Sequence, residues 1–224
     1  MSVLRSPIGL SRAVVALLGV VIAVDCYALY ADLEVRRLMQ GQVAAGQPRA
    51  TVEGVGADVL MSGAGVLESL SFLATAVVFI LWFHRVRVNA GVFAPDMFGS
   101  GPGWAIGAWF IPIANVVIPC KIARQTWRAS RRDPYAAYGK GERPTLVMGW
   151  WLVWLFSGFV DALATRAYDD ADRASEFVTA CEALAVSEVA DAVAAVLAIV
   201  VVRRLTAMQD AKAQYGPVLA PAAV

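Results

Sequence analysis

The sequence has few charged residues and almost none of the residues that build metal sites or disulfide frameworks. Only 17% of its 224 residues are charged, and it contains one histidine and three cysteines. These numbers give neither a disulfide framework nor a zinc-ligand spacing. The net charge of +1 provides no basic field, so we expect no binding to nucleic acid.

Hydrophobic residues dominate instead. They make up 59% of the chain, and the mean hydropathy is +0.62. This composition predicts an integral membrane protein. A helix needs roughly 20 apolar residues to cross a hydrocarbon core of about 30 Å. Four segments are long enough: residues 13–31, 59–83, 146–163 and 184–202.

The predicted fold is therefore an all-α integral membrane bundle of four transmembrane helices. We expect a single transmembrane domain over residues 1–212 and a disordered C-terminal tail over residues 213–224, because the tail is rich in Ala and Pro. No internal repeat and no second domain are visible in the sequence.

A further apolar run, residues 104–120, is predicted either to re-enter the membrane or to form a fifth span. Pro112 removes a backbone donor and Asn115 supplies a polar side chain, so a broken half-helix fits a re-entrant segment. Proline is also tolerated inside spanning helices, which keeps the second alternative open. The totals of Lys and Arg on the two sides do not separate the two arrangements.

The flanks of the second span favour re-entry. Glu53 and Asp58 precede this span, whereas His84, Arg85 and Arg87 follow it. Because cytoplasmic loops hold the excess of Lys and Arg, the C-terminal end of the span belongs in the cytoplasm. With a re-entrant run, both termini of this multi-pass membrane protein are then cytoplasmic.

A basic helix is predicted directly after the apolar run. Lys121, Arg124, Arg128 and Arg131 recur at spacings of three and four residues, with apolar residues between them. This pattern is typical of an amphipathic helix at the cytoplasmic interface, with its basic face toward anionic lipid headgroups. Alternatively, the cations serve only as a positive-inside stop signal. We also expect Trp82, Trp104 and Trp127 in an interfacial aromatic belt.

Residues 82–130 carry a recognisable pattern. It includes the Asn89-Ala90 pair, Trp104 after a glycine, Trp109, Pro112 with Asn115, and a closing WRAS. This stretch resembles the signature of an actinobacterial integral-membrane family catalogued as a domain of unknown function. The resemblance implies a bacterial inner-membrane protein with several helices. It implies no reaction, and no catalytic residue can be carried over from it.

Acidic residues inside the predicted spans are the main functional signal. A charged side chain in a span costs about 2.5 to 3.5 kcal/mol, so each needs a reason to be there. With re-entry, every span has at least one acid, all in the outer half of the bilayer, and no basic residue lies at that depth. The acids should therefore be protonated, share protons, face water or hold a cation. The candidate catalytic residues are Asp25, Glu68, Asp161, Glu188 and Asp191.

Aromatic and polar residues lie on the same helix faces as these acids. Trp150, Trp154, Ser157 and Asp161 recur at helical spacing on one span, and Glu68 and Phe79 belong to a similar stripe on another. An aromatic-lined cavity capped by acids would follow if the faces converge. The predicted substrate-lining residues are Trp150, Trp154, Ser157, Trp109, Asn115 and Phe79.

Three classes of function use these features differently. An intramembrane acid/base enzyme would act on a lipid-soluble substrate, most specifically by proton-initiated cyclisation of an isoprenoid, in which indoles stabilise the carbocation. No cofactor is predicted, although Mg²⁺ would accompany a bound diphosphate. A proton or cation relay would use the acids alone and would require an oligomer. A structural, partner-binding protein would use only the basic helix. The enzyme accounts for acids and tryptophans together.

Overall fold

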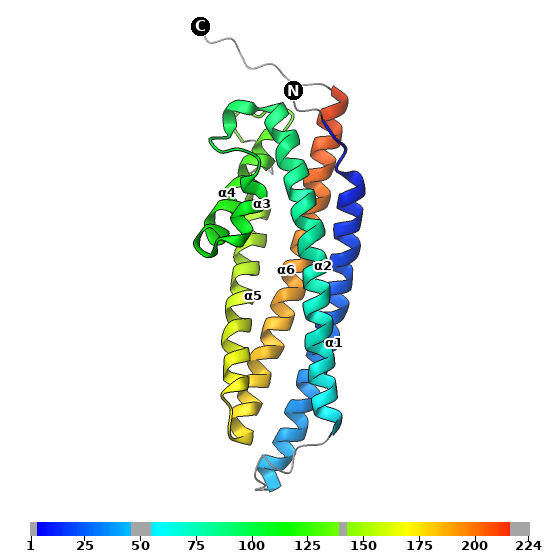
Figure 1. Cartoon of the computed structure of the whole chain (residues 1–224), viewed down its shortest axis with the longest axis vertical. Helices are drawn as coiled ribbons and strands as arrows, with labels where there is room; N and C mark the ends of the chain where they lie inside the picture. The colour runs from blue at the N-terminus through cyan, green and yellow to red at the C-terminus, as the bar shows by residue number, and fades with distance from the viewer. Residues whose placement is uncertain (1–3, 46–54, 139–142, 216–224) are drawn as a thin grey trace. The chain divides into compact units, whose positions relative to one another are not determined.

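The described part of the chain is mostly helical. The computed structural model describes residues 4–45, 55–138 and 143–215, and no strand occurs among them. The elements are α1 (Ile8–Ala45), α2 (Val55–Phe93), η2 (Pro95–Met97), α3 (Trp104–Gly107), η3 (Ala108–Phe110), α4 (Pro112–Ala129), α5 (Thr145–Asp169) and α6 (Ala174–Tyr215) (Figure 1). Residues 213–215, predicted to begin a tail, belong to α6, and residues 216–224 lie outside the described residues. The single domain over residues 1–212 stays a prediction.

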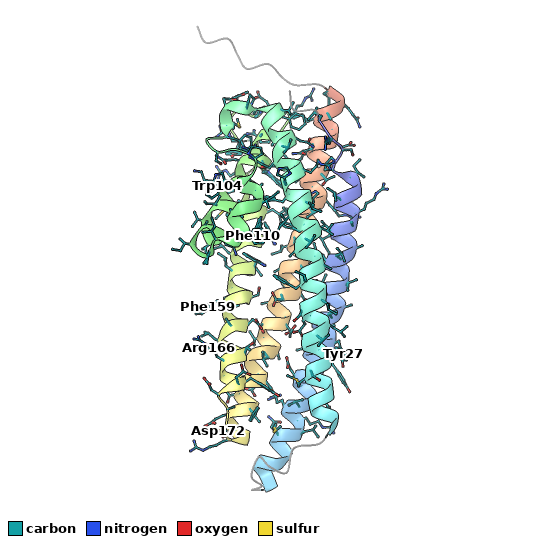
Figure 2. All side chains as sticks on the ribbon, viewed as in Figure 1. Tyr27, Trp104, Phe110, Phe159, Arg166 and Asp172 are labelled. Carbon is teal, nitrogen blue, oxygen red and sulfur yellow. The ribbon has the colours of Figure 1, made fainter. Side chains whose placement is uncertain are left out.

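Four helices are long and apolar enough to cross a membrane, which confirms the predicted class of multi-pass membrane protein. The candidate spans are Ile8–Gly41, Met61–Phe93, Thr145–Asp169 and Ser175–Tyr215, each longer than the hydropathy pattern predicted. At most 39% of the most apolar window of any span is buried inside the protein. Large apolar side chains such as Leu70, Phe72 and Phe159 are exposed (Figure 2). Such surfaces are stable in lipid, where apolar side chains need no protein cover.

The chain divides into two compact units. Unit 1 comprises residues 1–16, 75–151 and 197–224, and unit 2 comprises residues 17–74 and 152–196. Each unit contains part of all four long helices. We describe the two units separately.

In unit 1, buried polar side chains join the ends of the helices. Gln209 on α6 donates to the carbonyl of Val86 at 2.8 Å and accepts from Asn89 at 3.1 Å. Asn89 in turn accepts a hydrogen bond from the backbone N–H of Arg5 and donates to its carbonyl. Lys212 donates to the backbone carbonyl of Ala129 at 2.8 Å. The start of α1 and the ends of α2, α4 and α6 are therefore tied together.

The segment that follows α2 packs against α4 and α5 within unit 1. Gln125 donates to the carbonyl of Met97 at 3.1 Å, and Trp151 donates to the carbonyl of Val116 at 3.1 Å. The predicted break lies at Ile111, which is extended between η3 and α4. Residues 104–120 thus belong to α3, η3 and the first part of α4 rather than to one continuous helix (Figure 1).

Prolines explain this broken geometry. Pro112 begins α4, where a missing N–H costs nothing because the first turn of a helix has unsatisfied donors anyway. Pro119 lies inside α4 and is fully buried, and it removes the hydrogen bond that would otherwise reach the carbonyl of Asn115. The side-chain oxygen Oδ1 of Asn115 is buried without a partner among the described residues.

Two tryptophans predicted for the interfacial belt are buried instead. Trp82 is 1% exposed, and its indole N–H donates to the hydroxyl of Thr206 at 3.1 Å. Trp127 is also buried, whereas Trp104 is exposed (Figure 2). Burial of Trp82 is favourable because α6 supplies a hydrogen-bond acceptor for its indole.

A glycine in α2 makes room for a buried cation. A Cβ at Gly91 would lie 3.1 Å from Nη1 of Arg87. The Arg87 guanidinium lies 3.5 Å from the centroid of the Phe98 ring and donates to the carbonyl of Ser100 at 2.7 Å. The absence of a side chain at Gly91 therefore lets Arg87 hold the loop that follows α2.

Replacing Gly91 by alanine should disturb this contact. Alanine ordinarily stabilises a helix by about 1 kcal/mol over glycine. Gly65→Ala, also in α2 but with open space around the Cβ, is the matched control and should show that gain. We expect Gly91→Ala not to show this gain in stability, because the Arg87 guanidinium must move. Denaturation of both variants in detergent provides the measurement, and an equal gain at the two positions would contradict the expectation.

Unit 2 is held by small and apolar contacts. Ala28 and Ala31 of α1 pack against Ala64 of α2. Val35 and Met39 of α1 form a second cluster with residues of the α5–α6 turn and α6, namely Ala171, Phe177 and Cys181. The small alanines allow the helices to approach closely, which brings polar side chains on neighbouring helices near one another.

Candidate functional site: a carboxyl cluster in unit 2

All five predicted catalytic acids lie in unit 2, and they come from all four of its helices. Asp25 is on α1, Glu68 on α2, Asp161 on α5, and Glu188 and Asp191 on α6. Asp25 interacts electrostatically with Asp191 and Glu68, and Glu68 interacts with Asp161 and Asp191. Glu188 interacts with Asp25, Glu68 and Asp191. The structure thus brings the five acids into one electrostatically connected cluster.

A sixth carboxyl group was missed by sequence reasoning. Asp32 is buried at 4% exposure and interacts electrostatically with Glu68 and Glu188. The predicted span ends at residue 31, so Asp32 is not counted among the acids of the spans, but α1 continues to Ala45. Its spacing of seven residues from Asp25 could have revealed it, because residues two turns apart share a helix face. We refer to these six side chains as the carboxyl cluster.

Burial differs strongly within the carboxyl cluster. Asp25 is 6% exposed and Glu188 is 8% exposed. Glu68 and Asp191 are half-buried, and Asp161 is exposed on the surface of α5. The cluster therefore extends from an accessible carboxyl group to fully enclosed ones.

One oxygen of the carboxyl cluster has no partner. Oδ2 of Asp25 is buried and makes no hydrogen bond within the described part of the chain. Leaving a buried acceptor unsatisfied costs about 1 to 3 kcal/mol, and more for a charged group. A carboxyl group retained at such a cost is a candidate for chemistry that needs an available oxygen.

No salt bridge neutralises the carboxyl cluster within residues 4–45, 55–138 and 143–215. An ion pair beyond Asp32 on α1 joins Arg36 to Glu182 of α6 at 2.9 Å. Arg36 lies four residues beyond Asp32, or about 6 Å along the helix. From Arg36 to Asp25 the distance along α1 is about 16 Å, roughly half of a hydrocarbon core. Along α1, Asp32 and then Asp25 thus lie at increasing distance from the charged Arg36.

Two predicted lining residues lie in the same unit as the acids. Ser157 is fully buried and interacts electrostatically with the carboxyl of Asp191. Its hydroxyl also donates to the carbonyl of Trp154, one turn earlier on α5. Ser157 therefore adds a polar group to the carboxyl cluster.

The other four predicted lining residues, Phe79, Trp109, Trp150 and Asn115, belong to unit 1. There the aromatic rings pack on one another. The ring centroids of Phe79 and Trp109 are 5.7 Å apart, and those of Phe79 and Trp150 are also 5.7 Å apart. Edge-to-face packing of this kind stabilises helix contacts. A substrate-lining role for these residues stays a prediction.

The carboxyl cluster is not arranged as a metal site. No group of three or more His, Cys, Asp or Glu side chains in the described ranges has a geometry that could hold a metal ion. Magnesium and calcium prefer several oxygen ligands around one point.

The predicted headgroup-binding residues divide into two sets. Lys121, Arg124 and Arg128 are exposed on α4, as a basic interfacial helix requires. Arg131 differs from the prediction, because it follows the end of α4 and is 5% exposed. It donates to the backbone carbonyls of Ala136 and Ala137 at 3.0 and 2.9 Å. Arg131 thus holds the loop after α4 rather than facing lipid.

These features define the chain as an all-helical membrane protein with four candidate spans and a cluster of carboxyl groups contributed by each of them. Residues 49–207 match the family described as "Domain of unknown function (DUF4328)", and the chain belongs to this family. The expected membership of a family with that description is confirmed. No curated protein and no solved structure matches the chain.

Proposed function

We propose that the protein is a proton relay of the membrane, in which the carboxyl cluster takes up protons and passes them from one carboxyl group to the next. The observation that carries this proposal is the enclosed oxygen Oδ2 of Asp25, which has no partner within the described residues. Protonatable carboxyl groups inside a membrane commonly serve as proton relays.

Each transfer step is an exchange between two carboxyl groups. A protonated carboxyl group releases its proton to a neighbouring carboxylate, directly or through one water, and the charges of the two groups are exchanged. Glu188 suits such an exchange because it interacts electrostatically with both Asp25 and Asp32. Those two residues are about 10 Å apart along α1. Glu188 would therefore pass protons between Asp25 and Asp32.

We propose that the protein lies in the bacterial cytoplasmic membrane with both termini in the cytoplasm. Unit 1 contains most of the basic residues at the helix ends, including Arg85, Lys121 and Arg124. The helix ends of unit 2 carry acids such as Asp170 and Glu182. This distribution follows the excess of Lys and Arg that marks cytoplasmic loops. The carboxyl cluster would then take up protons from the outer side.

Isoprenoid cyclisation uses the same acids but needs an apolar cavity beside them. A proton relay uses the carboxyl groups alone and needs no such cavity. We therefore favour the relay, and the cyclase remains the alternative to be separated from it by experiment.

The test is proton flux into liposomes that contain the purified protein and a pH-sensitive dye. A potassium diffusion potential would drive protons inward. We expect wild-type liposomes to acidify faster than empty ones, and Glu188→Gln to lower the initial rate at least about tenfold. Glu182→Gln is the matched control, because Glu182 lies on the same helix but is exposed and paired with Arg36.

Two results would argue against the relay. Wild-type liposomes that acidify no faster than empty ones would remove it. Equal rates for wild type and Glu188→Gln would show that the carboxyl cluster is not the path. An isoprenoid cyclase would instead form product in detergent, lose it in Glu188→Gln, and show no flux in the wild type.

A further inference from the structure

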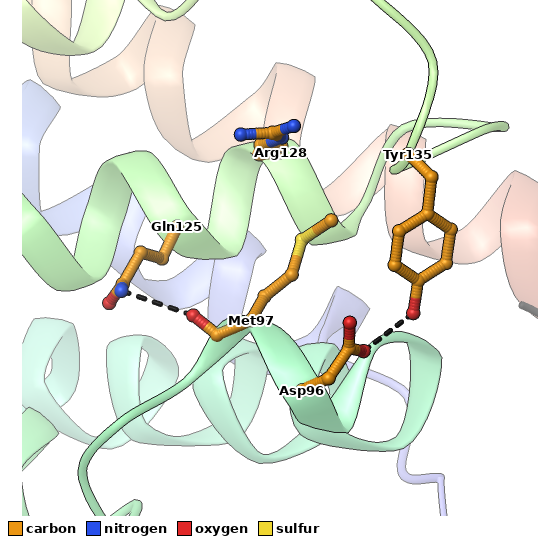
Figure 3. Close-up of a pocket in the computed structure, with 5 residues that line it drawn as sticks. All are labelled: Asp96, Met97, Gln125, Arg128 and Tyr135. Carbon is orange, nitrogen blue, oxygen red and sulfur yellow. Dashed lines mark hydrogen bonds between the residues drawn. The ribbon is translucent and has the colours of Figure 1, made fainter. Parts of the chain in front are cut away.

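A second candidate site lies in unit 1, away from the carboxyl cluster in sequence and in chemistry. A cavity of about 330 Å³ is lined by Asp96 and Met97 of η2, Gln125 and Arg128 of α4, and Tyr135 of the following loop (Figure 3). Its volume is in the range of small-molecule sites. We call it the η2–α4 pocket.

Hydrogen bonds fix the walls of the η2–α4 pocket. Gln125 donates to the backbone carbonyl of Met97 at 3.1 Å, and the hydroxyl of Tyr135 donates to Oδ1 of Asp96 at 2.6 Å (Figure 3). The Nε–H group of Arg128 donates to the carbonyl of Pro134 at 3.2 Å. The lining side chains are thus held in place before any ligand arrives, which lowers the entropic cost of binding.

The pocket presents two opposite charges that do not neutralise each other. Arg128 and Asp96 both line it, yet no salt bridge joins them in the described part of the chain. Arg128 uses only its Nε–H group in the contact with Pro134, so its terminal nitrogens can still donate. Asp96 uses Oδ1 for Tyr135, so its Oδ2 can still accept.

The hydroxyl of Tyr135 remains the hydrogen-bond donor to Asp96 over a wide range of pH. Its hydrogen bond to Asp96 raises the pKa of the phenol. The hydroxyl therefore remains protonated at neutral pH, and its orientation toward Oδ1 leaves the second oxygen of Asp96 directed to other ligands.

We propose that the η2–α4 pocket binds a phosphoethanolamine group, in which a phosphate and a primary ammonium are joined by two carbons. The phosphate would accept hydrogen bonds from the terminal nitrogens of Arg128, whose planar guanidinium suits phosphate oxygens. The ammonium would donate to Oδ2 of Asp96. The two carbons would lie against Met97 and the ring of Tyr135.

The position of the pocket indicates a membrane lipid as the source of this group. Asp96 follows the end of the second candidate span at Phe93 by three residues. Arg128 is on the same helix as the exposed Lys121 and Arg124. Basic helices at span ends lie at the level of lipid headgroups. A soluble phosphoethanolamine compound has the same chemistry, and the experiment separates the two sources.

The test is lipid retention by the full-length protein, measured by native mass spectrometry from detergent. Dioleoyl lipids with ethanolamine, choline and glycerol headgroups are offered at equal concentration. We expect the ethanolamine lipid to be retained at least about tenfold better than the other two. Equal retention of ethanolamine and choline lipids would overturn the proposal, because the choline group has no N–H donor for Asp96.

Substitutions of Arg128 and Asp96 test which residue binds the phosphate and which binds the ammonium. Arg128→Gln should weaken retention of the ethanolamine lipid about tenfold. Asp96→Asn should remove the preference over the choline lipid. Arg124→Gln is the matched control, since Arg124 is exposed on α4 but does not line the pocket. Unchanged retention in both Arg128→Gln and Asp96→Asn would also overturn the proposal.

Two further measurements test the role of Tyr135 and the source of the phosphoethanolamine group. Tyr135→Phe removes the hydroxyl but leaves the carboxylate of Asp96, so the ethanolamine preference should persist; its loss in this variant alone would contradict the role given to Asp96. O-phosphoethanolamine is also titrated alone. Binding of the soluble compound without retention of the lipid would assign the site to a soluble ligand, and displacement of retained lipid would assign it to the headgroup.

Discussion

Replacing Asp25 by asparagine is expected to lower the proton flux to about a tenth of the wild-type flux, with the flux of empty liposomes subtracted from both. Asparagine has the same shape and can fill the same space, but its amide cannot release and take up a proton near neutral pH. Oδ2 of Asp25 is buried and has no partner among the described residues, so the substitution removes no hydrogen bond made at that atom. The effect should therefore be on transfer rather than on folding.

The measurement uses the liposome assay with an Asp-to-Asn control in the same unit. Asp170 is exposed at the end of α5, so Asp170→Asn should leave the flux unchanged. Asp25→Asn should elute from size exclusion at the wild-type volume. A rate above half of the wild-type value in Asp25→Asn would show that protons bypass this residue, and the relay would then have no role for the deepest acid on α1.

Replacing Gln209 by leucine is expected to cost about 2 to 4 kcal/mol of unfolding free energy. Gln209 is 1% exposed and makes three side-chain hydrogen bonds, to the carbonyl of Val86, to Ser130 and to Asn89. Leucine fills a similar volume but leaves Asn89 and Ser130 without that partner. Polar groups left unsatisfied in the interior account for most of the expected cost.

Thermal unfolding in detergent, followed by tryptophan fluorescence, would measure this loss. A midpoint lowered by about 5 to 10 °C is expected for a chain of this size. Gln214→Leu on the same helix is the matched control, because Gln214 is exposed and its only described contact is a long one to Asp210 at 3.5 Å. Equal midpoints for the two variants would mean that the buried contacts of Gln209 are replaced by other partners.

The four spans were predictable because their hydropathy is high over long stretches, whereas their ends were not. Helices α1 and α6 continue well beyond the apolar windows. A hydropathy window stops at the first group of charged residues, but the backbone hydrogen bonds of a helix continue through them. This is why Asp32 was missed. Its burial comes from neighbouring helices, which a window along one chain does not contain.

The carboxyl cluster was predictable in part for a related reason. Charged residues inside a span are rare and costly, so Asp25, Glu68, Glu188 and Asp191 stand out in the sequence. Exposure could not be derived in the same way: Asp161 is exposed and Asp25 is enclosed, although both lie within apolar helices. The burial of Trp82 likewise depends on Thr206, more than a hundred residues away in sequence.

The proposed orientation, in which residues 94–138 stay on the cytoplasmic side between α2 and α5, has a consequence for biosynthesis. The exposed cations of α4, among them Lys121, Arg124 and Arg128, never have to be carried across the hydrocarbon. Each would cost about 2.5 to 3.5 kcal/mol at the centre of a bilayer. With the orientation proposed above, the insertion machinery can release α1 with α2 as one helical hairpin and α5 with α6 as another, without moving the segment between them across the membrane.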